Sequence, residues 1–188
     1  MLNNKKILIG ITGGIAVYKV CSLINKLKKE KAIVKVIMTE SATKFVSQLT
    51  FQSLLGEPVY LDMFNSIGKE GVEHIKLADW CDVFVLAPAT YNSINKICCG
   101  LADNLLTTTI AALPDKIPVL IVPAMNCHMW ENKILQDNIK KINLIKINAK
   151  LNKYNFVGPD NGKLACGYEG YGKISGNDEI IKKISDLL

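Results

Sequence analysis

Short apolar runs alternate with segments of helical spacing along most of this chain. The runs predict strands, because they are almost continuous in apolar residues and lie between polar or glycine-containing connections. They cover residues 7–12, 33–38, 58–61, 83–87, 119–122 and 144–147. Strands that are apolar on both faces are typical of a parallel sheet covered by helices on each side.

The segments between these runs place apolar residues at the spacing of one helix face. The expected helices cover residues 15–29, 41–55, 72–80, 91–101, 104–113, 132–141 and 178–188. Within 41–55, the apolar stripe is expected from Phe45, Val46, Leu49 and Leu54. No repeat or low-complexity linker interrupts the alternation. It therefore predicts one α/β domain over residues 1–188, built as a doubly wound, Rossmann-type parallel sheet in three layers.

Composition and charge narrow the choice of partners. The 188 residues are 49% hydrophobic and 21% charged, which allows a sizeable core and argues against disorder. The net charge of +6 comes from lysines spread over the expected helices without interleaved aromatics, so a solvated helical face is favoured over nucleic-acid binding. A mildly basic surface would still attract a phosphorylated small molecule. No apolar run is long enough to cross a membrane.

The N-terminus and the cysteines indicate a cytoplasmic protein. Residues 1–6 lead directly into the first expected strand without the apolar region of a signal peptide. The six cysteines form no CxxC pair and the chain has two histidines, so neither a metal site nor a disulfide framework is expected. Most of the thiols should be small buried hydrophobes, with Cys166 as the exception.

The most informative segment follows the fifth apolar run and reads PAMNCHMW over residues 123–130. It places Asn126 where a buried strand ends and a helix begins. Ligands of open α/β sheets bind beyond the carboxyl ends of the strands. An amide in that position can orient a carboxylate or an amide without adding a charge, and a hydrogen bond to a charged group contributes about 1.5–3 kcal/mol.

Three strand-to-helix connections carry small residues or hydroxyls. The turn Gly10–Ala16 puts glycines before the first expected helix, where backbone N–H groups favour an anion, although its spacing is not the GxGxxG of dinucleotide-binding folds. Thr39 and Ser41, after the second strand, suit a phosphate or a ribityl chain. Residues 87–93 (APATYNS) suit a phosphate or a flavin edge, and their hydroxyl and amide side chains would equally well cap the following helix.

A glycine-spaced segment around residues 155–174 lacks periodicity and predicts a flap. Cys166 lies in it between Ala165 and Gly167, and a thiol in such a position can donate a proton. An incidental cysteine in a surface loop is the alternative. His74 stands among apolar residues before the fourth strand, and by itself it would be interpreted as a structural hydrogen-bonding residue.

Taken together, these segments resemble the homo-oligomeric flavin-dependent cysteine decarboxylases over essentially the whole chain. The resemblance rests on GGIA at 13–16, HIxLxxW at 74–80, PATxN at 88–92 running on to GLADNLL at 100–106, PAMNxxMW at 123–130 and ACGxxGxG at 165–172. Any one of these motifs is weak evidence for the family, but all five in this order are specific for it.

The resemblance implies a flavodoxin-like fold with FMN at the strand ends, and sites built between the subunits of a trimer that could assemble further into a dodecamer. The residues that it implies for FMN are Gly14, Ile15, Ala16, Thr39, Ser41, Thr90, Tyr91, Asn92, Ser93 and Ala124. The implied catalytic residues are Asn126 on the substrate carboxylate, His74 as base or orienting group and Cys166 as proton donor, with Met129, Ala165 and Gly167 also contacting the substrate.

The implied activity is the decarboxylation of 4′-phosphopantothenoylcysteine to 4′-phosphopantetheine in coenzyme A biosynthesis. Oxidation of the carbon that bears sulfur gives a thioaldehyde, which can lose CO₂ to form an enethiolate; protonation by Cys166 and return of the hydride leave no net redox change. Three positions depart from the family pattern, one of them Ile174, where Met is usual. Tyr91 stands where Ala is usual, and Lys173 stands where Arg is usual, which removes a bidentate donor. Many members continue into a ligase domain, so a separate ligase chain is expected here.

Other functions stay open from the sequence. A peptidyl-cysteine decarboxylase, acting on the C-terminal cysteine of a peptide, would use the same FMN, His and Asn chemistry. Flavin prenyltransferases are disfavoured, because His74 and Asn126 match the decarboxylase pattern. A non-catalytic FMN-binding regulatory protein is the alternative from a different class, although the long acidic tail of such proteins is not present.

Overall fold

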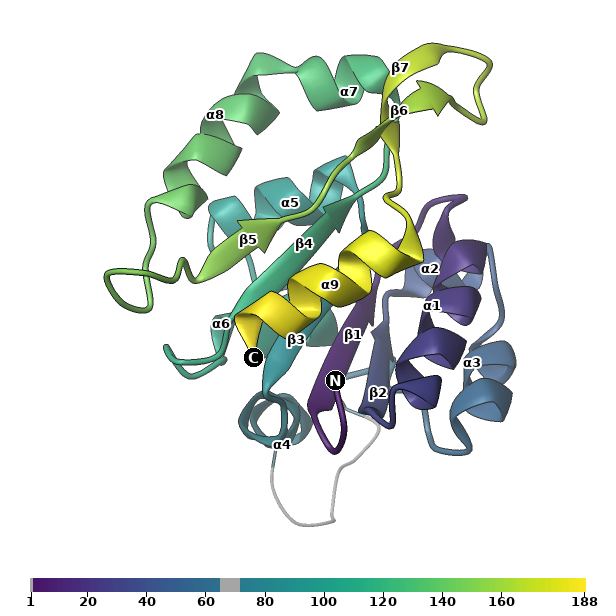
Figure 1. The fold of residues 1–188 in the computed structure, drawn as a ribbon, viewed down its shortest axis with the longest axis vertical. Coiled ribbons are helices and arrows are strands. Elements are labelled where there is room, and N and C mark those ends of the chain that lie inside the picture. Colours follow the sequence, from purple (N-terminus) through teal and green to yellow (C-terminus); the bar gives the residue numbers. More distant parts are fainter. Residues whose placement is uncertain (1, 65–71) are drawn as a thin grey trace.

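A computed structural model describes residues 2–64 and 72–188 (Figure 1). Its central sheet has the strand order β2-β1-β3-β4-β5, and all neighbouring strands are parallel. The strands are β1 (Lys6–Ile11), β2 (Ile33–Met38), β3 (Val83–Ala89), β4 (Val119–Pro123) and β5 (Tyr154–Phe156). This order is that of the flavodoxin-like doubly wound fold. The expected α/β class and parallel sheet are therefore confirmed.

Helices cover the two faces of the sheet with separate apolar clusters, because successive strand residues point to opposite faces. Ile9 belongs to the cluster on one face, whereas its neighbour Leu8 belongs to the cluster on the other. The first face carries α1 (Val17–Lys29), α3 (Gln48–Leu55) and α9 (Asn177–Leu187). The second carries α4 (Glu73–Trp80), α5 (Tyr91–Cys98), α6 (Leu105–Ala111) and α8 (Lys133–Asn143). Within the described ranges, no helix is both long enough and apolar enough to cross a membrane.

Short helices follow two of the strands, and one of them corrects an expectation. α2 (Glu40–Thr43) follows β2, and α7 (Cys127–Glu131) follows β4. The segment 41–55 is thus not one helix, since the side chain of Ser47 caps a new helix, α3. A hydroxyl at an N-cap is favoured enough to divide a helical pattern.

The apolar stripe expected within this segment is wrong at two of its four positions. Phe45 is 50% exposed and Leu49 is 67% exposed, while Phe51 is the fully buried side chain. The division into two helices changes the faces that these residues present. Val46 and Leu54 are partly buried against the core, as expected.

Two expected strands are absent from the sheet. Residues 58–61 contribute a single bridge, from Tyr60 to β2, and residues 144–147 contribute a single bridge, from Lys146, outside the sheet. The strand beside β4 is β5, whose three residues are all half-buried. Such a short edge strand carries too little apolar periodicity to be found from the sequence.

The expected flap is a β-hairpin for most of its length. β6 (Asp160–Lys163) and β7 (Glu169–Lys173) pair in antiparallel fashion at the top of Figure 1. Residues 155 and 156 belong to β5 and not to the flap. Glycine leaves no side chain from which a two-residue period could be recognised, and for that reason the sequence does not predict the hairpin.

Candidate active site

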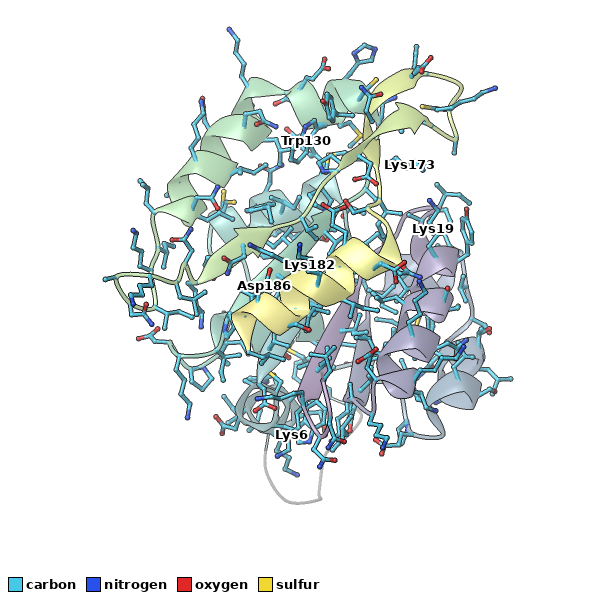
Figure 2. The ribbon with its side chains drawn as sticks, viewed as in Figure 1. Lys6, Lys19, Trp130, Lys173, Lys182 and Asp186 are labelled. Atoms are coloured by element: carbon cyan, nitrogen blue, oxygen red, sulfur yellow. The ribbon has the colours of Figure 1, made fainter. Side chains whose placement is uncertain are left out.

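A cavity of about 1040 Å³ lies at the carboxyl end of the sheet. It is bordered by the segments that follow β1, β3 and β4 and by the hairpin; Figure 2 labels two of its lysines, Lys19 on α1 and Lys173 on β7. The neighbouring ends of β1 and β3 are the switch point of this strand order, at which doubly wound sheets bind their ligands. The volume is at the upper end of the range for small-molecule sites, about 300–1,000 Å³.

Most residues predicted for the site line this cavity. They are Gly14, Ile15, Ala16, Thr39, Ser41, Thr90, Tyr91, Asn92, Ser93, Ala124, Asn126, Met129, Ala165 and Cys166. Parallel strands end at one edge of the sheet, so turns that are far apart in the sequence meet there.

Gly167 and His74 are not among the lining residues. Gly167 lies at the tip of the hairpin, where its N–H donates to the carbonyl of Leu164 at 3.0 Å. His74 lies on α4, at the opposite end of the sheet from the hairpin (Figure 1). A single chain therefore does not bring His74 together with Asn126 and Cys166.

Thr12 joins the ends of β1 and β3. Its hydroxyl donates to the carbonyl of Pro88 at 2.6 Å and accepts from the backbone N–H of Thr90 at 3.1 Å. The residue is 1% exposed, so these hydrogen bonds set the turn that borders the cavity. Sequence reasoning missed Thr12; a hydroxyl at the end of an apolar run was the available signal.

The N-terminus of α1 is open to an anion. No side chain caps it, and its first turn contains no acidic residue. Gly13 lets the turn approach the segment after β2 closely, because a Cβ on Gly13 would lie 2.5 Å from the Cβ of Ser41. The partial positive charge of this helix end, which no side chain caps, and a neighbouring hydroxyl together suit a phosphate.

The turn after β3 serves both as a helix cap and as part of the cavity wall. The hydroxyl of Thr90 accepts from the backbone N–H of Ser93 and also contacts its hydroxyl at 3.0 Å. Tyr91 donates through its hydroxyl to the side-chain oxygen of Asn132 at 3.2 Å, which joins α5 to the start of α8. The tyrosine that departs from the family pattern thus has a structural partner in this chain.

Asn126 is held in one orientation. Its Oδ1 accepts from the backbone N–H of His128 at 2.8 Å and caps α7, while its Nδ2 donates to Sγ of Cys166 at 3.2 Å. Since the cap uses the oxygen, the amide presents N–H donors to the cavity. Such a donor suits a carboxylate.

The thiol of Cys166 is exposed and accepts a hydrogen bond from the Asn126 amide. The backbone N–H of Tyr168 and the amide of Asn126 hold the pKa of Cys166 below its ordinary value. Burial instead raises the pKa of Cys81 to about 12 and that of Cys98 to about 11. Cys166 is therefore much better suited to exchange a proton than these buried thiols.

The hairpin is attached to the segment that carries Asn126. The backbone N–H of Met125 donates to the carbonyl of Gly172 at 3.0 Å. A Cβ on Gly172 would lie 2.2 Å from the carbonyl oxygen of Met125, and a Cβ on Gly170 would lie 3.0 Å from the side-chain Cβ of Cys127. These contacts at the base of the hairpin place Cys166 opposite Asn126.

Replacing Gly172 by Ala is expected to displace the hairpin. The added methyl group cannot share space with the Met125 carbonyl, and overpacking of this kind costs about 1–3 kcal/mol. Thermal unfolding and the KM for substrate would measure the change, with Gly176→Ala as the matched control, because no atom lies within 4 Å of a Cβ there. Equal behaviour of the two variants would contradict the proposed attachment.

Sequence reasoning also missed a group of lining residues from the connection between α5 and α6. Lys96 and Asp103 form an ion pair there, and the hydrogen bond from Lys96 lowers the pKa of Asp103. Asn104 and Thr107 cap α6 reciprocally and line the cavity as well. Their polar side chains are spread along two helices, so only the packing shows that they share one wall.

A switch-point cavity with an anion-binding turn and an adjoining amide and thiol is a site of the flavin-binding type. The sequence profile of the Flavoprotein family matches residues 1–188, and the chain belongs to this family. Membership gives it a flavin as cofactor.

Curated relatives include two kinds of protein. The coenzyme A biosynthesis bifunctional protein CoaBC of Bacillus subtilis is 46% identical over 182 residues, which cover 97% of this chain and 43% of that protein. The probable phosphopantothenoylcysteine decarboxylase of Streptococcus mutans is 39% identical over 186 residues, covering 98% of this chain and 99% of the relative. The chain thus spans less than half the length of the bifunctional relative and nearly all of the other.

Solved structures show the same fold. A cysteine-to-serine mutant of PPC decarboxylase complexed with pantothenoylaminoethenethiol has a TM-score of 0.83, with 29% identity over 98% of both chains. The FMN binding protein AtHal3 has a TM-score of 0.79, with 29% identity over 98% of this chain and 97% of the other. The flavodoxin-like fold implied by the sequence motifs is therefore confirmed.

Proposed function

We propose that the chain is a carboxy-lyase that uses FMN to decarboxylate 4′-phosphopantothenoylcysteine to 4′-phosphopantetheine in coenzyme A biosynthesis. The observation that carries this proposal is the Asn126 amide donating to the Cys166 thiol at 3.2 Å inside the flavin-type cavity. The names of the Bacillus and Streptococcus relatives support the pathway and the substrate. The PPC decarboxylase mutant was complexed with an enethiol, which supports a cysteine acting after CO₂ is lost. A cytoplasmic location remains a prediction from the sequence.

The residues present fit FMN. The uncapped start of α1, with Gly14 and Ser41 beside it, would hold one phosphate, and the turn lacks the spacing used for a dinucleotide. The hydroxyls of Thr90 and Ser93 lie along the same wall of the cavity. When bound, FMN supplies an acceptor and later a donor of a hydride equivalent at the carbon that bears sulfur.

Asn126 and Cys166 act in succession on the substrate. The Nδ2 donor of Asn126 binds and orients the carboxylate next to the oxidisable carbon, while its Oδ1 stays on the α7 cap. Loss of CO₂ from the thioaldehyde leaves an enethiolate, because the C=S group accepts the electron pair. The thiol of Cys166 then gives its proton to the enethiolate, and the hairpin limits the access of water.

We further propose a homo-oligomer in which α4 of one subunit supplies His74 to the cavity of another. In its own chain His74 is remote from the cavity, and it is half-buried on the helix surface. Val72 and Ile75 beside it are 55% and 44% exposed, which provides apolar surface for a subunit contact. A trimer, the assembly implied by the sequence motifs, would repeat this contact around a closed ring.

If subunits share the site in this way, two variants that are inactive alone should regain decarboxylase activity when they form mixed oligomers. Co-expressed in equal amounts, His74→Asn and Cys166→Ser chains are expected to form about one quarter of wild-type sites, since each site draws its two residues independently from two subunits. Formation of 4′-phosphopantetheine by the purified mixed oligomers measures this recovery. Each variant expressed alone is the control, and no recovery in mixed oligomers would place both residues in one chain's site.

The visible spectrum of the purified protein, followed by mass analysis after adding 4′-phosphopantothenoylcysteine, tests the proposed function. A flavin spectrum with conversion to 4′-phosphopantetheine is the expected result. Turnover of a peptide with a C-terminal cysteine, but not of this substrate, would identify a peptidyl-cysteine decarboxylase. A flavin spectrum with neither reaction would identify a binding or regulatory protein.

A further inference from the structure

Two exposed aromatic rings meet between α7 and the tip of the hairpin. The centroids of His128 and Tyr168 lie 5.2 Å apart, and the ring planes are inclined by 72°. This edge-to-face arrangement is the one that aromatic pairs prefer. Nothing in the function derived so far uses either ring.

Each of the two residues also contacts a catalytic residue through its backbone. The N–H of His128 donates to Oδ1 of Asn126 and fixes that amide. The backbone N–H of Tyr168 is the largest cause that lowers the pKa of the Cys166 thiol. The ring pair thus connects the peptide that orients Asn126 to the peptide that orients Cys166.

Substrate binding makes this connection important. The base of the hairpin is attached through Met125 and Gly172, whereas the tip meets α7 through the hydrogen bond from Asn126 to Cys166 and through the ring pair. A carboxylate bound to Asn126 competes for the Nδ2 donors, one of which now serves the thiol. The ring pair is a contact between the tip and α7 that does not depend on this amide, so it helps to keep the tip, and with it the thiol, over the substrate.

We propose that His128 is a positioning residue, whose edge-to-face contact with Tyr168 keeps the Cys166 thiol in place for proton donation, in the free protein as well as while Asn126 binds the substrate carboxylate. The proposal rests on the proposed function for the role of Cys166. It predicts that an aromatic ring at position 128 is sufficient, since the contact is between ring faces and edges and needs no imidazole chemistry.

The test compares His128→Ala with His128→Phe, and Tyr168→Ala with Tyr168→Phe, in the FMN-loaded protein. The first readout is the pH dependence of Cys166 alkylation by iodoacetamide, followed through the mass of its peptide; exposed Cys99 serves as an internal reference. The second is the ratio of enethiol to 4′-phosphopantetheine formed in turnover, together with KM and kcat.

Both Ala variants are expected to move the midpoint of Cys166 alkylation to higher pH and to raise the enethiol ratio about 2- to 10-fold, the range for an aromatic pair. Both Phe variants should resemble the wild type. Ala variants with the alkylation midpoint and the enethiol ratio of the wild type would overturn the proposal. A His128→Phe variant that shifts both quantities as far as His128→Ala does would also overturn it. The alkylation readout needs no substrate, so it remains decisive even if 4′-phosphopantothenoylcysteine is not converted and the proposed function fails.

Discussion

Replacing Cys166 by Ser stops the reaction after CO₂ has left, so that the enethiol product and reduced flavin accumulate. A hydroxyl in this position is a far weaker acid than a thiol whose pKa is lowered by Tyr168 and Asn126. Loss of a positioned general acid slows a step by about 10²–10⁴-fold. We expect 4′-phosphopantetheine formation to fall within this range while CO₂ release in the first turnover continues.

An anaerobic single turnover measures both parts of this prediction. The flavin absorbance should bleach and stay bleached, and the product should be lighter than 4′-phosphopantetheine by one H₂. Cys99→Ser is the matched control, since Cys99 is also an exposed thiol but does not line the cavity. Normal release of 4′-phosphopantetheine by Cys166→Ser would remove Cys166 from the mechanism.

Replacing Asn126 by Asp is expected to abolish decarboxylation without unfolding the protein. Asp retains an oxygen for the N–H of His128 and so keeps the cap of α7. It loses the Nδ2 donor, worth about 1.5–3 kcal/mol toward a charged group, and adds repulsion between carboxylates. Together these effects should lower kcat/KM on the order of 10³-fold.

Asn132→Asp is the matched control for this variant. Asn132 caps α8 through the same kind of side-chain contact, to the N–H of Ile134 at 3.0 Å, but lies outside the cavity lining. Thermal unfolding and flavin content should be close to wild type in both variants, with activity lost only in Asn126→Asp. A fully active Asn126→Asp enzyme would refute the assigned role.

Much of the fold was predictable because burial on both faces leaves a strong mark in the sequence. Ile33–Met38 was predicted with the bounds that β2 has, and β3 consists entirely of buried residues. Such strands require helices on both faces of the sheet, so the alternation of strands and helices indicated a sheet between two layers of helices. The sheet edge was not predictable in the same way, since residues 58–61 are as apolar as a strand but form only one bridge.

The candidate site was likewise predictable only in part from the sequence. Thr90 and Asn126 could be placed near one another from the sequence, because the carboxyl ends of parallel strands share one edge of the sheet. Sequence patterns carry no information on which atom of an amide faces a ligand, so the outward donor of Asn126 emerged only from its helix cap. The distance of His74 from this edge likewise follows from where α4 packs.

The sequence by itself determined the alternation of the main strands and helices, the parallel sheet and most of the predicted residues that line the cavity at its edge, because these depend on local burial and on where strands end. Only the tertiary structure decided which strands are neighbours within the sheet and how Thr12 joins β1 to β3. It also decided how the hairpin is attached through Gly172 and that the rings of His128 and Tyr168 meet. These are contacts between segments far apart in the chain, and their partners are selected by the packing of the whole molecule.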